Sequence, residues 1–288
     1  MNERALVLGG GGSSGQAWSI GVTAGLYDAG LDVRQADLII GTSAGATVAV
    51  QLSGADEPPS LLASILAAPG PVTAGGRVPN RPVIEQLERT GRIIAAAEDA
   101  PDMRRRMGAA ALDLEAAADG SWAPRWRAIV AARLPSAHWP ARPLLITAVN
   151  ARTGEPVVFD RHSGVDLADA VAASTSSGLP YPIGGHRYID GGYRRNENAD
   201  LAAGYARVLV LSPFGGRSRH PLEWGLHLAT QVEDLRAGGS RVEPIVPDPQ
   251  DEHLFGAQAM DLSLRVPVAQ AGYRQGHALA GPLTEFWR

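Results

Sequence analysis

One serine stands in a setting that can make it a nucleophile. The pentapeptide GTSAG at 41–45 has the pattern Gly-x-Ser-x-Gly, in which small residues let the chain turn sharply and hold the serine hydroxyl out of the turn. The apolar segment 38–40 predicts a buried strand before the turn, and 46–52 predicts a helix after it. Ser43 would then lie at a helix N-terminus, where free N–H groups favour developing negative charge. The sequence therefore predicts Ser43 as the nucleophile of an acyl transfer.

Four consecutive glycines, residues 9–12, follow the first apolar segment of the chain. Glycine loses more backbone entropy on ordering than other residues, so such a run needs a reason. The stretch 10–15 satisfies G-x-G-x-x-G, as in dinucleotide sites, but the second strand ends in Gly-Thr-Ser, without the acidic residue that holds a ribose. A Walker-type phosphate loop needs a lysine, and the chain has none.

Two interpretations of the glycine loop remain. The loop could serve only the close packing of a strand on a helix. We favour the other: neighbouring strands of a parallel sheet would bring the loop beside Ser43, where backbone N–H groups of Gly10, Gly11 and Gly12 would form an oxyanion hole.

A second group must take the proton of Ser43 before the hydroxyl can attack. Asp190 follows the apolar pair 188–189 and precedes Gly191 and Gly192, which predicts a carboxylate at a strand end. Asp-Gly-Gly by itself is typical of an ordinary turn, and it gains significance here from the other two motifs. We expect partial burial to raise the pKa of Asp190 above the usual value of about 3.9, because burial disfavours the charged form.

Two alternatives to this Ser–Asp pair stay open. One is a Ser-His-Asp triad of the α/β-hydrolase type, with His220 or His277 as the base. The other is a catalytically silent lipid- or protein-binding module.

The composition excludes several classes of protein. The chain of 288 residues is 45% hydrophobic, enough for a sizeable core, and its net charge of -4 provides no basic face for nucleic acid. The absence of cysteine excludes disulfides and thiolate chemistry. His, Asp and Glu show no spacing typical of metal ligands, so we expect no metal and no cofactor. No apolar leader opens the chain, so we expect a cytoplasmic protein.

Apolar periodicity predicts an α/β protein with a central, mainly parallel sheet. A helix is predicted over 16–29, and a helical insertion over about 58–137. Segments 143–150 and 155–160 predict a hairpin, and further helices are predicted over 221–237 and from 253 to the end. The remaining predicted strands are 5–8, 207–213 and 241–248.

The three motifs, in this order, resemble those of the patatin-like phospholipase family. The segment 173–192 is also similar to the stretch of small residues and prolines that leads into the aspartate in that family, and the resemblance covers about 4–50 and 140–215. The residues that carry the motifs are Gly10, Gly12, Gly15, Gly41, Thr42, Ser43, Ala44, Gly45, Asp190, Gly191 and Gly192.

The resemblance implies a three-layer α/β sandwich with helices on both faces of the sheet. It implies that Ser43 and Asp190 form a catalytic dyad without histidine, acting on acyl esters of lipids or phospholipids. Residues 4–215 would form the catalytic domain, including the insertion, and 216–288 would complete it with a strand and helices. The sequence indicates neither the oligomeric state nor the lipid head group.

One departure from the family bears on the substrate. Many members have a basic residue shortly after the glycines, where this chain has Ser13 and Ser14. This favours a generic lipid or carboxyl ester over a phospholipid.

Aromatic and arginine-rich stretches in and just after the helical insertion could form a lipid-facing cap. Three tryptophans and a run of arginines could contact a membrane surface transiently, or could simply pack in the core and face solvent. These residues are Trp122, Trp126, Trp139, Arg104, Arg105 and Arg106.

Overall fold

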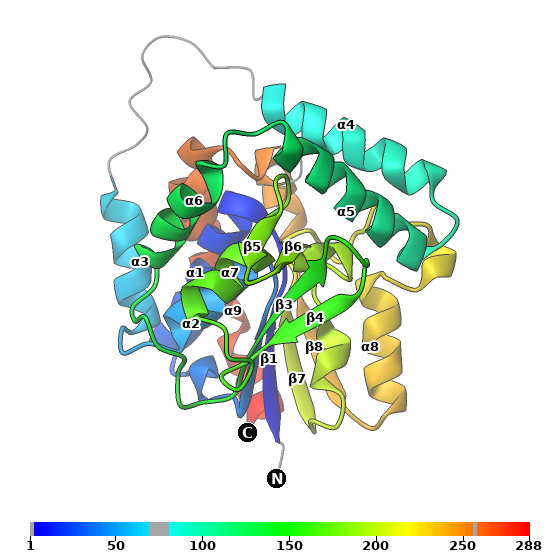
Figure 1. The fold of residues 1–288 in the computed structure, drawn as a ribbon. Helices are drawn as coiled ribbons and strands as arrows, with labels where there is room; N and C mark the ends of the chain where they lie inside the picture. The colour runs from blue at the N-terminus through cyan, green and yellow to red at the C-terminus, as the bar shows by residue number, and fades with distance from the viewer. Residues whose placement is uncertain (1–2, 69–80, 256–257) are drawn as a thin grey trace.

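The computed structural model describes residues 3–68, 81–255 and 258–288, which form a sheet covered by helices on both faces (Figure 1). The sheet has eight strands in the order β5-β6-β3-β2-β1-β7-β8, and β4 pairs with β3 beside this path. The strands are β1 (Arg4–Leu8), β2 (Leu38–Gly41), β3 (Leu144–Asn150), β4 (Pro156–Phe159), β5 (Tyr181–Ile183), β6 (His186–Asp190), β7 (Arg207–Leu211) and β8 (Arg241–Ile245).

Nine α-helices occur in the described residues. They are α1 (Gly12–Asp28), α2 (Ala44–Leu52), α3 (Pro58–Ala67), α4 (Arg81–Ala96), α5 (Ala100–Ala116), α6 (Trp122–Ala131), α7 (Leu167–Ser174), α8 (Leu228–Ala237) and α9 (Arg265–Trp287). Short 3-10 helices include η2 (Gly191–Tyr193) and η3 (Ala199–Ala202).

Side chains along the central strands point alternately to the two faces of the sheet, and each face has its own hydrophobic core. Leu6 and Leu8 of β1 face one side of the sheet, in the core with α1, α2, α7 and α9, whereas Ala5 and Val7 face the other side, with α8 and η3. Both faces are apolar because β1, β2, β3, β7 and β8 run parallel and helices cover each side. The chain is therefore a three-layer α/β sandwich, which confirms the predicted fold class.

Strands β2 and β6 pair, one after the other, with the same side of β3. Ile146 pairs with Gly41 of β2 and, on its other side, with β4. Two residues further on, Ala148 pairs with Asp190 of β6 and again with β4. Because β4 occupies the same side of β3 at both positions, β2 and β6 must share the opposite side. Because β2 runs parallel to β3 and β6 runs antiparallel to it, the C-terminal ends of β2 and β6 face each other.

Several predicted boundaries differ in the structure. The helix predicted to begin at residue 16 begins at Gly12, so that the end of the glycine loop is already the first turn of α1. The helix predicted over 221–237 begins only at Leu228, because a 3-10 turn and the left-handed Gly225 (φ 63°) interrupt the apolar pattern. The 143–160 hairpin is confirmed as β3 and β4. Residues 69–80 of the helical insertion and 256–257 lie outside the described residues.

The three tryptophans of the candidate cap serve packing. Trp122 and Trp126 stack at 6.3 Å between ring centroids and pack against the main core, and the Trp126 indole N–H points at the Thr175 hydroxyl (3.2 Å). The Trp139 indole N–H donates to the Val165 carbonyl (2.8 Å). These contacts favour the packing alternative over a lipid-facing cap.

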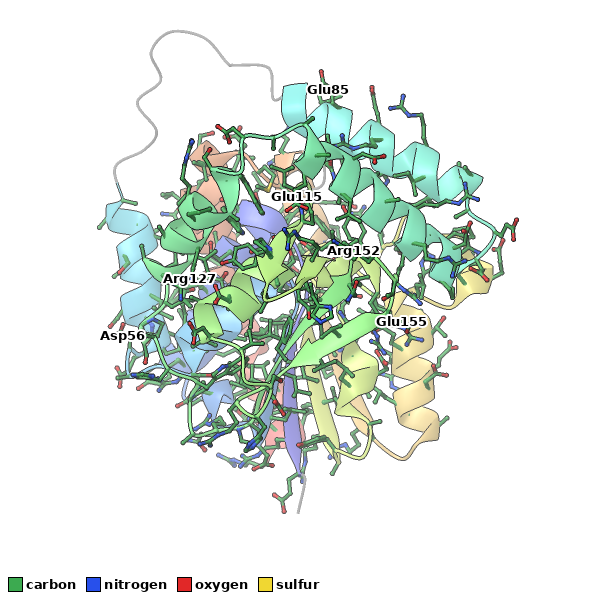
Figure 2. All side chains as sticks on the ribbon, in the orientation of Figure 1. Asp56, Glu85, Glu115, Arg127, Arg152 and Glu155 are labelled. Atoms are coloured by element: carbon green, nitrogen blue, oxygen red, sulfur yellow. The ribbon has the colours of Figure 1, made fainter. Side chains whose placement is uncertain are left out.

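Ion pairs link the helical insertion to α7 and to the sheet. Arg127 of α6 pairs with Asp169 of α7 (2.8 Å), and Glu115 at the end of α5 accepts from Arg187 of β6 (2.6 Å). Figure 2 labels Arg127 and Glu115. Arg105 and Arg106 are about half exposed and pair with Asp102, as expected for a solvated helix face, whereas Arg104 is half-buried and donates to the Gly154 carbonyl.

Helices α1 and α9 pack closely through glycines. A Cβ on Gly276 would lie 2.2 Å from the Val22 carbonyl oxygen, and one on Gly25 would lie 2.2 Å from the Tyr273 carbonyl oxygen. The two backbones therefore approach more closely than any side chain allows, which seats the C-terminal helix on the helix that carries the glycine loop.

We expect Gly276→Ala to lower the free energy of unfolding by about 1–3 kcal/mol, as for an overpacked core, even though alanine is the better helix former. Gly281→Ala on the same helix is the matched control, because nothing outside the chain neighbours lies within 4 Å of its Cβ position. The control should change stability by less than about 1 kcal/mol. Equal effects of the two substitutions in urea unfolding would contradict this account of the interface.

Candidate active site

Ser43 sits on a strained turn between β2 and α2. Its backbone has φ 53° and ψ -123°, a region that costs a non-glycine residue about 1–3 kcal/mol. The turn holds because α2 lies directly against β1: a Cβ on Gly45 would be 2.0 Å from the Leu8 carbonyl oxygen, and one on Gly41 would be 2.5 Å from the Ala46 Cα. The Gly-x-Ser-x-Gly spacing is therefore a steric requirement of the turn that holds Ser43.

Asp190 meets Ser43 at the shared side of β3. The Ser43 hydroxyl donates to Oδ2 of Asp190 at 2.7 Å, and the Gly192 N–H donates to Oδ1 at 2.8 Å. The Asp190 side chain is 6% exposed. Gly191 allows the turn after the aspartate, because a Cβ there would lie 2.2 Å from the Thr147 hydroxyl.

Burial controls the basicity of this carboxylate. Desolvation raises the pKa of Asp190 to about 6, and the hydrogen bonds from Gly192 and Ser43 oppose this rise by stabilising the ionised form. A carboxylate with this pKa is ionised at neutral pH and is still a stronger base than a free aspartate.

A buried polar network joins the two loops. Asn198 is fully buried with a left-handed φ of 55°, which asparagine tolerates. Its Nδ2 lies 2.9 Å from the Thr42 hydroxyl and 3.3 Å from the Gly191 carbonyl oxygen, and the Thr42 hydroxyl lies 3.0 Å from that of Thr147. The serine turn and the aspartate turn are thereby held together by the same side chains.

The glycine loop lies beside Ser43, as the favoured interpretation expected. A Cβ on Gly10 would lie 3.4 Å from the Ser43 Cβ. The Gly10 N–H, however, donates to the Asn196 carbonyl (3.0 Å), and the Ser43 N–H donates to the Ser174 hydroxyl (2.9 Å). Neither amide is available to an oxyanion, which corrects the expectation for Gly10.

Two amides of the loop remain candidates for the oxyanion hole. Within the described part of the chain, the N–H groups of Gly11 and Gly12 have no hydrogen-bond acceptor. Gly12 has a φ of 61°, which turns the chain into α1 and aligns these amides with the helix N-terminus. Gly15 packs in the first turn of α1, where a Cβ would lie 3.0 Å from the Pro213 Cβ.

None of the seven histidines forms a hydrogen bond with the side chain of Ser43 or Asp190. His220 contacts the Ser218 hydroxyl (2.6 Å), stacks on Trp224 and lines a separate cleft of about 470 Å³; burial lowers its pKa to about 4. His277 lies on α9 beside Tyr273.

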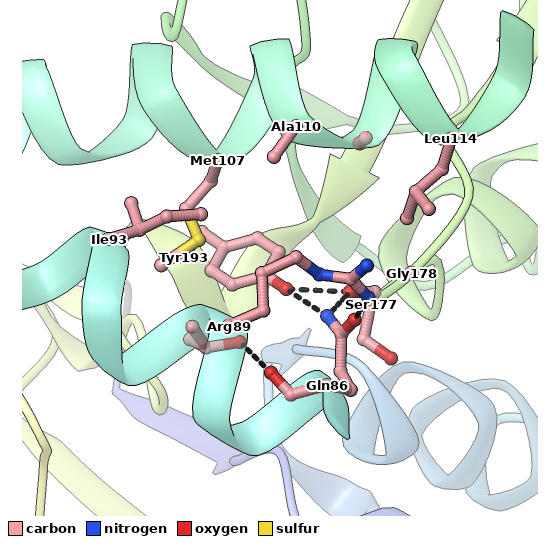
Figure 3. A pocket seen from close by; sticks show the side chains of 11 residues that line it. Gln86, Arg89, Ile93, Met107, Ala110, Leu114, Ser177, Gly178 and Tyr193 are labelled. Atoms are coloured by element: carbon pink, nitrogen blue, oxygen red, sulfur yellow. Dashed lines mark hydrogen bonds between the residues drawn. The ribbon is translucent and has the colours of Figure 1, made fainter. Parts of the chain in front are cut away.

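Helix α4 covers the loop after Asp190. The Tyr193 hydroxyl donates to the Ser177 carbonyl (2.6 Å), and Gln86 of α4 donates to the Tyr193 oxygen (3.3 Å) (Figure 3). Burial, and then the charge of Asp190, raise the pKa of Tyr193, so it stays a neutral phenol. The cavity among these residues and α5 is about 10 Å³, room for one water molecule and too small for an acyl chain.

A cation from the far end of the chain reaches the start of α1. Nη1 of Arg265 donates to the Ser13 hydroxyl (3.1 Å) and to the Gln16 side-chain oxygen (3.0 Å). Among the residues that the structure describes, no carboxylate pairs with this guanidinium. Burial lowers the pKa of Arg265, and the positive charge of Arg133 lowers it further. The segment with Ser13 and Ser14 thus faces an unpaired positive charge.

The sequence analysis did not identify four residues that contact the site through tertiary structure: Ser174, Asn196, Asn198 and Arg265. Only Ser174 had a local signal, because it lies in the segment of small residues 173–192. In the described residues, no group of three or more His, Asp or Glu side chains is arranged to hold a metal ion.

Comparison with known proteins gives one family match. Residues 6–203 match the family model described as Patatin-like phospholipase. The crystal structure of VipD from Legionella pneumophila is similar over 98% of this chain and 67% of that chain, at 14% identity and a TM-score of 0.43. That of the type III effector protein ExoU is similar over 96% of this chain and 54% of that chain, at 17% identity and a TM-score of 0.35. No curated protein matches the chain.

The raised pKa of Asp190 predicts how the reactivity of Ser43 depends on pH. Below about pH 6 the carboxyl is protonated and cannot accept the serine proton, so the rate of labelling by a fluorophosphonate should fall about tenfold per pH unit on the acid side. Asp190→Asn, which is nearly isosteric but cannot take the proton, should abolish both the labelling and the acid limb. An acid limb near pH 4, or one that a histidine substitution removes, would contradict this role of Asp190.

Proposed function

The chain belongs to the patatin-like phospholipase family, and we propose that it cleaves acyl esters of lipids through a dyad of Ser43 and Asp190. The observation that carries this proposal is the 2.7 Å hydrogen bond from the Ser43 hydroxyl to a buried carboxylate with no histidine in contact. A serine whose hydroxyl is already directed at a base of raised pKa has the arrangement that acyl transfer requires.

The chemistry follows from this geometry. The Ser43 oxygen attacks the ester carbonyl carbon while its proton moves to Oδ2 of Asp190. The N–H groups of Gly11 and Gly12 then stabilise the oxyanion of the tetrahedral intermediate. When the intermediate collapses, the leaving alcohol takes the proton from Asp190 and the acyl group stays on Ser43. In a second round water attacks the acyl-enzyme while Asp190 accepts its proton, and when this intermediate collapses the Ser43 oxygen leaves, takes that proton back from Asp190 and releases the acid.

The positions of the histidines weaken the triad alternative. His220 and His277 have their own partners, and neither contacts Ser43 or Asp190. The silent-module alternative is weakened because the strained Ser43 turn directs its hydroxyl at a buried carboxylate of raised pKa, an arrangement that binding alone does not require.

We expect Ser43→Ala to abolish hydrolysis of a short-chain p-nitrophenyl ester and labelling by a fluorophosphonate, because the hydroxyl is the group that forms the acyl-enzyme. The variant should stay folded by circular dichroism, and its activity should fall by several orders of magnitude, as for loss of a nucleophile.

The seven histidine variants, made singly, form the matched comparison. Each should keep its rate within about tenfold of the parent, whereas loss of a triad base costs orders of magnitude more. One histidine variant as inactive as Ser43→Ala would establish the triad instead.

Arg265 bears on the class of lipid. The sequence favoured a generic lipid or carboxyl ester over a phospholipid, since Ser13 and Ser14 stand where many members of the family have a basic residue. The Arg265 guanidinium beside Ser13 instead supports a substrate with an anionic head group. Met260, 51% exposed, lies beside the same loop, within 2.8 Å of the Cβ position of Gly12, and would contact the lipid surface. In the described residues, no helix is long and apolar enough to cross a membrane.

We therefore expect Arg265→Gln to lower the preference for an anionic lipid. The ratio of kcat/KM for dihexanoyl phosphatidylglycerol to that for dihexanoylglycerol should fall about tenfold, equivalent to about 1.4 kcal/mol. Arg274→Gln on the same helix is the control. The Arg274 side chain is 63% exposed, and its ion pair is with Asp251, at 3.9 Å, and not with the glycine loop. An unchanged ratio in Arg265→Gln would show that the guanidinium has no part in substrate choice.

A further inference from the structure

Asn196 holds Gly10 from both sides. Its backbone carbonyl accepts the Gly10 N–H at 3.0 Å, and its side-chain Nδ2 donates to the Gly10 carbonyl oxygen at 3.2 Å. The side chain lies directly against the loop, since a Cβ on Gly10 would be 2.8 Å from Oδ1 of Asn196. Six residues after Asp190, one asparagine thus fixes the peptide groups before and after Gly10.

The second of these bonds acts on the neighbouring amide. A peptide unit is planar and trans, so the Gly10 carbonyl and the Gly11 N–H point in opposite directions. A donor that holds the carbonyl in place therefore determines where the Gly11 N–H points. That N–H has no acceptor within the described part of the chain, and the loop beside it lies next to Ser43.

We propose that Asn196 is a positioning residue that directs the Gly11 N–H at the oxyanion formed on the substrate. This rests on the proposed serine hydrolase function and goes beyond it, because it assigns a residue outside the dyad and the glycine loop. The bond to the Gly10 carbonyl also polarises that peptide, which strengthens its N–H as a donor.

Glu197 fixes the orientation of the Asn196 amide. Nδ2 carries two hydrogens: one goes to Gly10, and the other is donated to Oε1 of Glu197 at 2.9 Å. The Glu197 side chain is 1% exposed and also accepts from the Ser212 hydroxyl (2.7 Å) and from Gln231 (3.4 Å). If the amide were flipped, Oδ1 would face the Gly10 carbonyl oxygen and Oε1 of Glu197, which are both acceptors, so the orientation with Nδ2 facing them is the stable one.

The arrangement couples the base to the oxyanion hole. Asp190, Asn196 and Glu197 belong to one stretch of chain, and the Cβ position of Gly192 lies 3.9 Å from Oδ1 of Asn196. Any displacement of the aspartate turn would therefore also displace the loop that carries the Gly11 amide.

The test replaces Asn196 by Asp, which has the same shape but no N–H to donate. With a p-nitrophenyl ester, kcat should fall about a hundredfold, as when one oxyanion donor is lost, while KM changes less than about threefold. A trifluoromethyl ketone analogue, which forms a tetrahedral adduct with Ser43, should lose affinity in parallel with kcat/KM. Asn150→Asp is the control, because Oδ1 of Asn150 only accepts, from the Arg152 and Thr153 amides, and should behave as the parent.

Further measurements separate this role from a structural one. If Asn196→Asp does not fold by circular dichroism, Asn196→Ser removes the amide without adding charge and should give the same split between kcat and KM. The acid limb near pH 6 should persist in Asn196→Ser, because Asp190 keeps its surroundings. Parent-like kcat, or a loss carried by KM with undiminished ketone affinity, would overturn the proposal. Failure of the parent to react with a fluorophosphonate would refute the proposed function itself.

Discussion

The shared side of β3 is the constraint on which the site depends. β2 runs parallel to β3 and stops at Gly41, and β6 runs antiparallel and stops at Asp190, two positions further along the same side. Two strands that approach each other end to end must both turn out of the sheet where they meet. Ser43 and Asp190 occupy those two turns, which is why residues 147 positions apart in sequence share a 2.7 Å hydrogen bond.

Desolvation makes this contact chemically useful. The sheet end and the helical layer bury Asp190, and its hydrogen-bond donors among the described residues are two neutral groups, the Gly192 amide and the Ser43 hydroxyl. No cation in that part of the chain pairs with the carboxylate, and burial raises its pKa to about 6, which suits the base of the proposed mechanism at neutral pH. An arginine paired with Asp190 would have made a stronger ion pair and a weaker base.

The loop from Asp190 to Asn198 organises the rest of the site. Asn198 joins it to the serine turn, Asn196 joins it to the glycine loop, and Tyr193 joins it to α4. Arg194 and Arg195 of this loop pair with Asp200, whereas Arg265 on α9, a helix seated on α1 by facing glycines, pairs with no carboxylate in the described residues. The C-terminal helix thus contributes to both the stability and the electrostatics of the active-site end.

The sequence by itself determined the parts that depend on local sterics. Sharp turns need glycine at fixed offsets, so Gly41, Gly45 and Gly191 marked the turns at both strand ends, and apolar alternation predicted the α/β fold. Tertiary structure decided what depends on burial and on distant partners. The N–H of Gly10 is occupied, Asn196 holds the loop, and Arg265 supplies a charge across 252 residues. No local pattern encodes these contacts, because each arises only when the sheet brings separate segments together.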